Sequence, residues 1–234
     1  MSEKILTKSY IENLEYEVEE LDYRIFLIKN FIKESESEEL VELAINANHE
    51  EWCKEYMIGA KKLAQLKFGT DDIDSLVSQG LYEITDNWYD KNLRINDHKI
   101  ANILKKRCQE LFDFRKDIQF NGCGTIQRQY EGVPLKDHVD NHTDPSLEYA
   151  VVFYLNDEYT NGEVFFVNQK IELRPPKNSI LVFPTSENWR HGVNSPGPGP
   201  HRYVIPGFVS RKNFWKKHKK NRYNVNKTIE DTNL

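Results

Sequence analysis

The sequence is poor in cysteine and has no long apolar run, and each absence narrows the class of protein. Among its 234 residues are three scattered cysteines, Cys53, Cys108 and Cys123. Such a set fits buried reduced thiols better than a disulfide framework or a C-x-x-C metal site. No apolar run approaches the ~20 residues that a membrane helix needs, and the mean hydropathy is −0.71. We therefore expect a cytoplasmic protein in a reducing setting, without a membrane segment.

Other signals are also missing. Residues 1–8 are charged and lack the apolar stretch of a secretory signal. The net charge of −5 gives no general reason to expect nucleic acid as a partner. The basic residues between 211 and 222 are interpreted first as a solvated, partly helical tail, with an acidic or nucleic-acid partner as the secondary interpretation.

The length supports one structural domain with an ample core. Residues 1–120 are expected to form an N-terminal strand and helical support, residues 121–210 a β-rich core, and residues 211–234 a basic tail. In the support region, residues 23–32 predict a strand. A capping box at residues 35–38 predicts the start of a helix. A second helix is expected from Asp97, with one apolar face formed by Ile100, Ile103, Leu104, Cys108, Leu111 and Phe112.

After Phe120 the sequence changes to short β-forming runs separated by glycine, proline and asparagine. Eight such runs fit a double-stranded β-helix, the jelly-roll architecture of the cupins, buttressed on one sheet by the N-terminal helices. Because proline removes a ladder hydrogen bond, we expect a bulge or a strand end at Pro206. The predicted strands are residues 123–131, 138–141, 147–155, 163–167, 169–173, 179–183, 190–193 and 202–209.

Two histidines and a carboxylate stand in this β-rich region in an order that suggests a metal site. His138 and Asp140 are two residues apart, so on an extended strand their side chains point to the same side. His191 follows 53 positions later, far enough to come from another strand, and Gly192 beside it allows close backbone approach. Two histidines and one carboxylate are the ligand set of mononuclear non-haem iron(II) sites.

The sequence also offers rival ligands. His142 and Asp144 form a second H-x-D pair, but the stretch ends in a proline and reads as a turn, so we favour His138 and Asp140. His142 remains a candidate for the rim of the pocket. His201 competes with His191, but it lies in a Pro-Gly-Pro loop.

Arg202 follows His191 by 11 positions, a spacing that suits a cation at the far end of a small dicarboxylate ligand. Its guanidinium offers a planar fork for a carboxylate, which a lysine does not. Without the histidines, a surface ion pair would be the preferred interpretation of this arginine.

These motifs resemble the prolyl-hydroxylase branch of the 2-oxoglutarate- and Fe(II)-dependent dioxygenases. The resemblance covers about residues 123 to 210, less than half of the chain. The similar segments are residues 125–130, 138–141, 147–156, 161–165, 176–184, 190–193 and 202–203.

The resemblance implies Fe(II) bound by the H-x-D pair and the distal histidine, with 2-oxoglutarate as cosubstrate, O2 as oxidant and ascorbate as a candidate support. It implies that Arg202 pairs with the outer carboxylate of 2-oxoglutarate and that the hydroxyl of Tyr154 supports that contact. Tyr130 matches a second tyrosine that reaches the cosubstrate or substrate, although a packed strand aromatic explains it equally well. Gln129 stands where collagen-type members often have arginine, which puts a substrate contact there in doubt.

The expected function is hydroxylation of a side chain, with peptidyl proline as the first candidate and a protein or peptide as the partner. Trp189 is a candidate for stacking on the proline ring, against an equally good interpretation as a packed core residue. A small-molecule or nucleic-acid oxygenase is the alternative within the family, nucleic acid being disfavoured because base-stacking motifs are not evident. A non-oxygenase, cupin-like metal-binding protein is the alternative from another class. The specificity loops are expected at residues 50–95 and 131–148.

Overall fold

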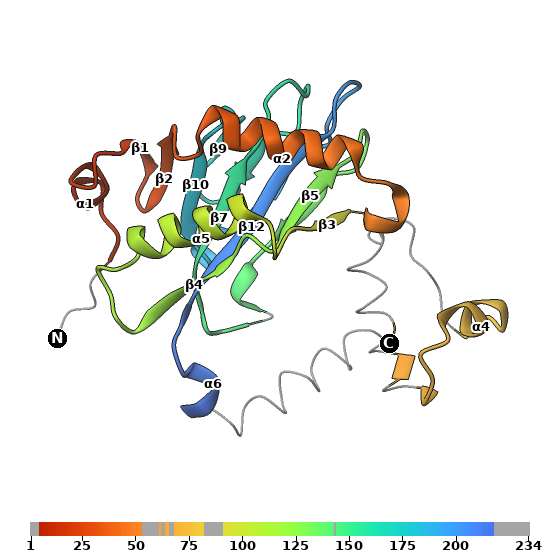
Figure 1. Ribbon diagram of the computed structural model, residues 1–234. Helices are drawn as coiled ribbons and strands as arrows, with labels where there is room; N and C mark the ends of the chain where they lie inside the picture. Colours follow the sequence, from red (N-terminus) through yellow and green to blue (C-terminus); the bar gives the residue numbers. More distant parts are fainter. Residues whose placement is uncertain are drawn as a thin grey trace.

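The computed structural model describes residues 5–52, 61, 64–65, 68–81, 91–142 and 144–217. Two antiparallel sheets dominate it, and helices lie against the larger one (Figure 1). The expected fold class, a mainly β double-stranded β-helix buttressed by N-terminal helices, is confirmed. No helix within the described ranges is both long and apolar enough to cross a membrane.

The larger sheet has eight strands in the order β1-β2-β10-β7-β12-β5-β3, with β4 pairing to β12 beside β5. The N-terminal hairpin therefore extends the same sheet as the β-rich core, because β2 pairs with β10. Its strands are β1 (Glu17–Asp22), β2 (Ile25–Lys29), β3 (Asn92–Arg94), β4 (Ile118–Gly122), β5 (Thr125–Gln129), β7 (Leu147–Tyr154), β10 (Ile180–Pro184) and β12 (Arg202–Arg211).

The smaller sheet has four strands in the order β6-β11-β8-β9. It faces the larger sheet, and apolar side chains from both sheets form one buried cluster between them. Its strands are β6 (Leu135–His138), β8 (Val164–Phe166), β9 (Ile171–Leu173) and β11 (His191–Val193), and two short 3-10 helices, η1 (Asp140–His142) and η2 (Glu187–Trp189), flank them in sequence.

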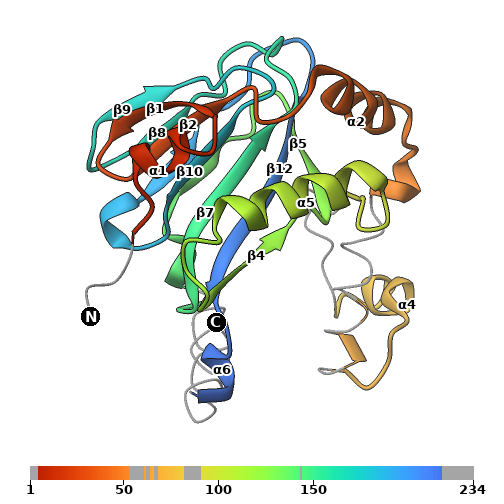
Figure 2. The same ribbon diagram turned by 60° about the vertical axis from the view of Figure 1, so that its left-hand side comes forward.

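Helices α2 (Glu34–Asn46) and α5 (Lys99–Leu111) lie across the outer face of the larger sheet (Figures 1 and 2). The shorter helices are α1 (Lys8–Glu12), α4 (Ile73–Ser78) and α6 (Phe214–Lys217). The predicted capping box at residues 35–38 is two positions too late. The helix begins at Glu34, and the Glu36 carboxylate accepts from the Lys33 backbone N–H at 2.9 Å.

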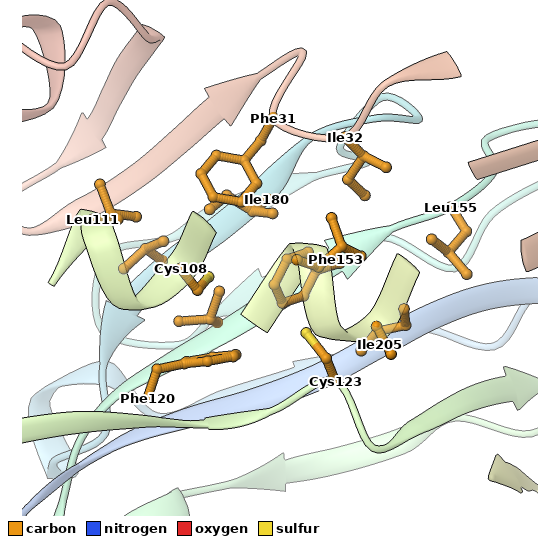
Figure 3. Packing of buried hydrophobic residues seen from close by; sticks show 14 of the residues in the cluster. Phe31, Ile32, Cys108, Leu111, Phe120, Cys123, Phe153, Leu155, Ile180 and Ile205 are labelled. Atoms are coloured by element: carbon orange, nitrogen blue, oxygen red, sulfur yellow. The ribbon is translucent and has the colours of Figure 1, made fainter. Parts of the chain in front are cut away.

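The buried face of α5 packs on the strands in a cluster shown in Figure 3. Cys108 of the helix faces Phe153 and Cys123 of the sheet region there. Both thiols are reduced and buried, as predicted, and burial raises the pKa of Cys123 to about 12. Cys53 lies outside the described residues. Ile103 departs from the predicted apolar face, because its side chain is 44% exposed and Ala101 takes the buried position.

Alternation along the central strand β7 divides the interior in two. Tyr149, Val151 and Phe153 point to the helix-covered side, whereas Ala150 and Tyr154 point to the side of the smaller sheet. This follows from the two-residue period of a strand. A strand buried on both faces is apolar throughout, which explains the continuous apolar run of β7.

Three local predictions about strands are wrong. Pro206 neither ends β12 nor bulges it; the strand runs on, and the register shift lies at Val209 and Ser210. One edge of β12 pairs with β7. Along the other edge, residues up to Val204 pair with β5 and residues from Gly207 pair with β4. Pro206 therefore lies between these two pairings. Strands β1 and β4 lie outside the predicted runs. Parts of the specificity loop expected at residues 50–95, and the tail beyond residue 217, lie outside the described residues.

Candidate metal and cosubstrate site

Three predicted ligands meet where β6 and β11 run side by side. His138 ends β6, His191 begins β11, and the two residues are register partners across the ladder. Asp140 lies in η1 directly after β6. The ligand atoms of all three residues lie within 4.8 Å of one another. His138 Nε2 is 3.3 Å from Asp140 Oδ1, and His191 Nε2 is 3.9 Å from Asp140 Oδ2.

The route by which Asp140 reaches this cluster differs from the prediction. The predicted strand over residues 138–141 does not form, because β6 ends at His138 and the chain turns into a 3-10 helix. The Asn141 N–H donates to the Thr185 carbonyl at 3.2 Å, which ties the turn to the end of β10. The turn, and not strand alternation, brings the carboxylate beside both imidazoles.

The outer nitrogen of each imidazole is held by a backbone carbonyl. His138 Nδ1 lies 2.9 Å from the Lys136 carbonyl, and His191 Nδ1 lies 3.1 Å from the Trp189 carbonyl. A carbonyl only accepts, so each Nδ1 carries the hydrogen and each Nε2 keeps its lone pair for a metal. Burial lowers the pKa of His191, whereas the hydrogen bond to Asp140 raises the pKa of His138.

Close backbone approach at this point depends on glycine. A Cβ on Gly192 would lie 2.5 Å from the Phe165 ring and 2.8 Å from the Leu135 carbonyl oxygen. A side chain there would push β11 away from β6 and β8, and with it one imidazole away from the other. The predicted close approach at Gly192 is therefore confirmed.

The rival ligands are engaged elsewhere. His142 is 60% exposed and pairs with Glu187 at 2.9 Å. Asp144 accepts from the backbone N–H and the hydroxyl of Ser146, at 2.9 and 2.7 Å, and so closes a turn. His201 lies against the rings of Tyr130 and Tyr203.

A cavity of about 270 Å³ opens between the two sheets beside the triad. The triad belongs to the smaller-sheet side, whereas Arg202 and Tyr154 reach the cavity from β12 and β7 of the larger sheet. Most other lining side chains are apolar. The remaining lining residues are Gln127, Leu135, Ala150, Val152, Val164, Phe183, Val193, Val204, Pro206, Gly207 and Phe208.

Arg202 is a buried cation without a counter-ion. It is 5% exposed, and no carboxylate in the described part of the chain lies within ion-pair distance of it. Its Nη1 donates to Gln129 Oε1 at a long 3.4 Å, and its Nε has no hydrogen-bond partner among the described residues. A buried charge is costly unless it is paired. An anion that enters the cavity would therefore meet the guanidinium of Arg202, which burial has already removed from water.

Two tyrosines flank this guanidinium. Arg202 Cζ lies 5.1 Å from the centre of the Tyr154 ring. Burial raises the pKa of Tyr154 to about 12 against the opposing charge of Arg202, so the phenol stays protonated and can donate. Tyr159, which the sequence analysis missed, is buried beside Arg202 in the same way, and burial raises its pKa.

The structure does not bring Tyr130 into the cavity. Its ring contacts His201 edge-on and lies 4.9 Å from the Arg128 guanidinium. Gln127 of β5 lines the cavity instead, and Gln129 of the same strand face contacts Arg202. Contact of Tyr130 with the cosubstrate stays a prediction.

Trp189 is a packed residue. Its indole N–H donates to the Tyr23 carbonyl at 3.3 Å, and Arg24 lies over its ring at 5.5 Å. It ties η2 to the N-terminal hairpin, so of its two interpretations the structural one holds.

Comparison with known proteins identifies the region that holds this cavity. Residues 125–210 match the family model described as the 2OG-Fe(II) oxygenase superfamily. These residues are therefore similar to that superfamily, and they include the three candidate ligands, Tyr154 and Arg202. No curated protein matches the sequence.

Solved oxygenase structures share the fold of nearly the whole chain. The viral collagen prolyl hydroxylase of Paramecium bursaria Chlorella virus-1 is 13% identical over 81% of this chain and 90% of its own, with a TM-score of 0.53. A Pseudomonas putida prolyl-4-hydroxylase is 12% identical over 87% and 98%, with a TM-score of 0.52. A Trichoplax adhaerens prolyl hydroxylase, solved with a hypoxia inducible factor peptide, is 14% identical over 81% and 84%, with a TM-score of 0.51. At these identities the likeness concerns the fold.

A Burkholderia pseudomallei oxidoreductase of the 2OG-Fe(II) oxygenase family is 23% identical, but over 49% of this chain and 57% of its own, with a TM-score of 0.42. This chain therefore spans little more than half of that relative, and the partial alignment carries no argument.

Proposed function

We propose that this oxygenase hydroxylates a side chain, with peptidyl proline as the first substrate class. The observation that carries the proposal is that the candidate iron ligands and a buried arginine, which has no carboxylate partner among the described residues, line one cavity. An iron site alone would also suit a cupin-like binding protein. The desolvated cation beside it supports a reaction that uses a dicarboxylate cosubstrate.

His138, Asp140 and His191 would hold Fe(II). Two neutral imidazoles and one carboxylate fit this ion and leave positions open for cosubstrate and oxygen. Held by these residues together with 2-oxoglutarate, Fe(II) would supply the oxidising chemistry, in which one atom of O2 would end in the hydroxylated substrate and the other in succinate, with CO2 as the further product. The backbone carbonyls of Lys136 and Trp189 keep both imidazoles in the tautomer that this role needs.

Arg202 would bind the outer carboxylate of 2-oxoglutarate, with the protonated Tyr154 hydroxyl as a further donor. A charge-assisted contact in a buried site is stronger than a neutral one. The apolar walls, among them Val152, Val204 and Phe183, would exclude water from the reacting groups. These residues orient the cosubstrate; the oxidising power comes from the metal.

The substrate would approach from the outer side of the triad. A surface hollow there is lined by His138 and Asp140, by the apolar side chains of Val139, Leu147 and Phe208, and by the polar side chains of Asp137, His142 and Arg190. Apolar surface beside the metal ligands suits an aliphatic ring such as proline. The folds shared with prolyl hydroxylases support this choice by analogy.

The test is mass spectrometry of proline-containing peptides, free proline and methylated oligonucleotides after aerobic incubation with Fe(II) and 2-oxoglutarate. We expect one added oxygen atom on a prolyl peptide and none with the Asp140→Ala protein. Oxidation of another class alone would refute the prolyl assignment and leave the oxygenase chemistry standing. Absence of succinate formation with every substrate class would contradict the oxygenase assignment itself.

A further inference from the structure

Gln129 stands at the end of β5 as the register partner of Arg202 on β12. Collagen-type enzymes often have arginine at this position, and the glutamine put a substrate contact there in doubt. The structure places the side chain against Arg202, whose Nη1 donates to Gln129 Oε1 at 3.4 Å. Gln129 is thus the residue of β5 that touches the proposed anchor.

The amide nitrogen of Gln129 is tied to two other segments. Nε2 donates to the Val133 carbonyl at 2.8 Å and, at a longer 3.5 Å, to the Asn194 carbonyl. Val133 lies in the turn before β6, and Asn194 directly follows β11. Both partners are acceptors, so they fix the orientation of the amide and leave its oxygen for the guanidinium.

An amide oxygen at this place affects the charge of Arg202 less than a carboxylate would. It can hold the guanidinium without neutralising it, because it carries only a dipole. A carboxylate in the same position would form an ion pair with Arg202 and occupy the charge that the cosubstrate needs. A purely apolar side chain would remove the hydrogen bond that orients the guanidinium but would leave the positive charge of Arg202 available to the cosubstrate.

We propose that Gln129 is a positioning residue that holds the Arg202 guanidinium in its binding orientation and, being neutral, keeps its full charge for the outer carboxylate of 2-oxoglutarate. The inference rests on the proposed function. It adds that the same amide anchors the turn before β6 and the end of β11, the two strands that carry His138 and His191.

The experiment measures equilibrium binding of 2-oxoglutarate to the Mn(II)-loaded full chain by calorimetry, without turnover. Gln129→Glu is expected to weaken binding at least about tenfold, the scale of one lost charge-assisted contact. Gln129→Leu, which keeps the free charge of Arg202, is expected to weaken it by only about two- to fivefold, as for a neutral hydrogen bond. Mn(II) affinity and the thermal midpoint of each variant serve as folding controls.

Gln127→Glu is the matched control. Gln127 lies two residues earlier on the same face of β5 and lines the same cavity, but no hydrogen bond joins it to Arg202. Gln127→Glu adds the same negative charge as Gln129→Glu, but at a position that makes no hydrogen bond to Arg202. A smaller loss of binding in Gln127→Glu than in Gln129→Glu supports the inference.

Equal losses in the two glutamate variants would overturn the inference, because general repulsion would then explain both. Unchanged binding in Gln129→Glu would also overturn it. Should the glutamate variant not fold, Gln129→Leu decides: unchanged 2-oxoglutarate affinity contradicts the positioning role. Wild-type protein that binds Mn(II) but no 2-oxoglutarate would refute the proposed function and, with it, this inference, whereas the other outcomes concern Gln129 alone.

Discussion

The two faces of the larger sheet use the same strands for different purposes. On the helix-covered face, Tyr203, Ile205 and Val209 of β12 join an apolar cluster with α2 and α5. On the other face, the alternate residues Arg202 and Val204 of the same strand line the cavity. One face is closed by an apolar cluster; the other keeps a cavity and a buried cation, Arg202, that has no carboxylate partner among the described residues.

This difference shows where stability and chemistry reside. A closely packed apolar face stabilises the fold through burial and dispersion. The cavity face lacks part of that packing, whereas the other side chains of β7 and β12 are buried in the cluster beneath the helices. Substitutions on the two faces should therefore separate activity from stability, even between adjacent residues.

The largest effect is expected at the metal ligands. His138→Ala or His191→Ala should abolish 2-oxoglutarate turnover, because two remaining ligands rarely hold the metal, and folding should be nearly unchanged. His142→Ala is the control: its imidazole pairs with Glu187 at the surface, so activity should persist. Metal content and succinate formation are measured together. Loss of iron from His142→Ala with retention in His138→Ala would show that the rival H-x-D pair holds the metal.

The sharpest test of the two faces uses neighbouring residues of β7. Phe153→Ala should destabilise the fold by about 3–5 kcal/mol, because it leaves a hole in the helix-covered cluster. Val152→Ala, which enlarges an existing cavity, should cost less than about 1.5 kcal/mol. Urea unfolding measures both variants. Equal losses would contradict the distinction between the two faces.

Arg202→Ala should raise the apparent Michaelis constant for 2-oxoglutarate roughly ten- to hundredfold, the value of a charge-assisted contact of about 1.5–3 kcal/mol. Iron affinity should stay nearly constant, because the arginine lies on the other sheet from the triad. Its removal also relieves a buried unpaired charge, so the thermal midpoint should not fall. An unchanged Michaelis constant would place the cosubstrate anchor elsewhere.

The smallest effect concerns acid stability on the helix-covered face. Burial works to raise the pKa of Glu36, but the hydrogen bond and charge of Arg107 outweigh it, and the net pKa lies below the ordinary 4.5. A depressed acid pKa contributes stability above the unfolded pKa, and this contribution is lost as pH falls below about 4.5 through the folded pKa. Glu36→Gln should lower the free energy of unfolding by about 1–2 kcal/mol at neutral pH, and it should reduce the loss of stability between neutral and acidic pH.

Glu39→Gln is the control for that variant. Glu39 pairs with Lys99 at 3.1 Å, but both side chains are well exposed, so its loss should cost below about 1 kcal/mol. Denaturant unfolding between pH 3 and 7 gives both values. If Glu36→Gln loses as much stability at acidic pH as the unchanged protein does, the ion pair of Glu36 with Arg107 does not contribute.

Much of the fold was predictable because its signals are local. Short apolar runs separated by turn residues indicated the jelly roll, and apolar spacing indicated α5. The failures have physical reasons. Ile103 has the right residue type and approximate spacing, but the actual orientation of the helix exposes it. Strand β1 is largely polar and forms because the β2 edge pairs with it.

The site was predictable in residue identity more than in geometry. His138, Asp140 and His191 were chosen from spacing and order, and the structure brings them within 4.8 Å of one another. The reasoning from strand alternation was wrong, because a 3-10 turn places Asp140. The contact of Gln129 with Arg202 and the place of Tyr159 beside the same guanidinium could not be recognised, since these residues have no distinctive spacing and gain significance only beside Arg202.

The sequence by itself determined the order of strands along the chain, the residue types available to bind iron and an anion, and the apolar character of both interior faces. Tertiary structure decided which residues meet. Pairing of β6 with β11 joins residues 53 positions apart, and pairing of β12 with β5 sets Gln129 against Arg202. Register and turns decide such encounters because a shift of one residue sends each side chain to the opposite face.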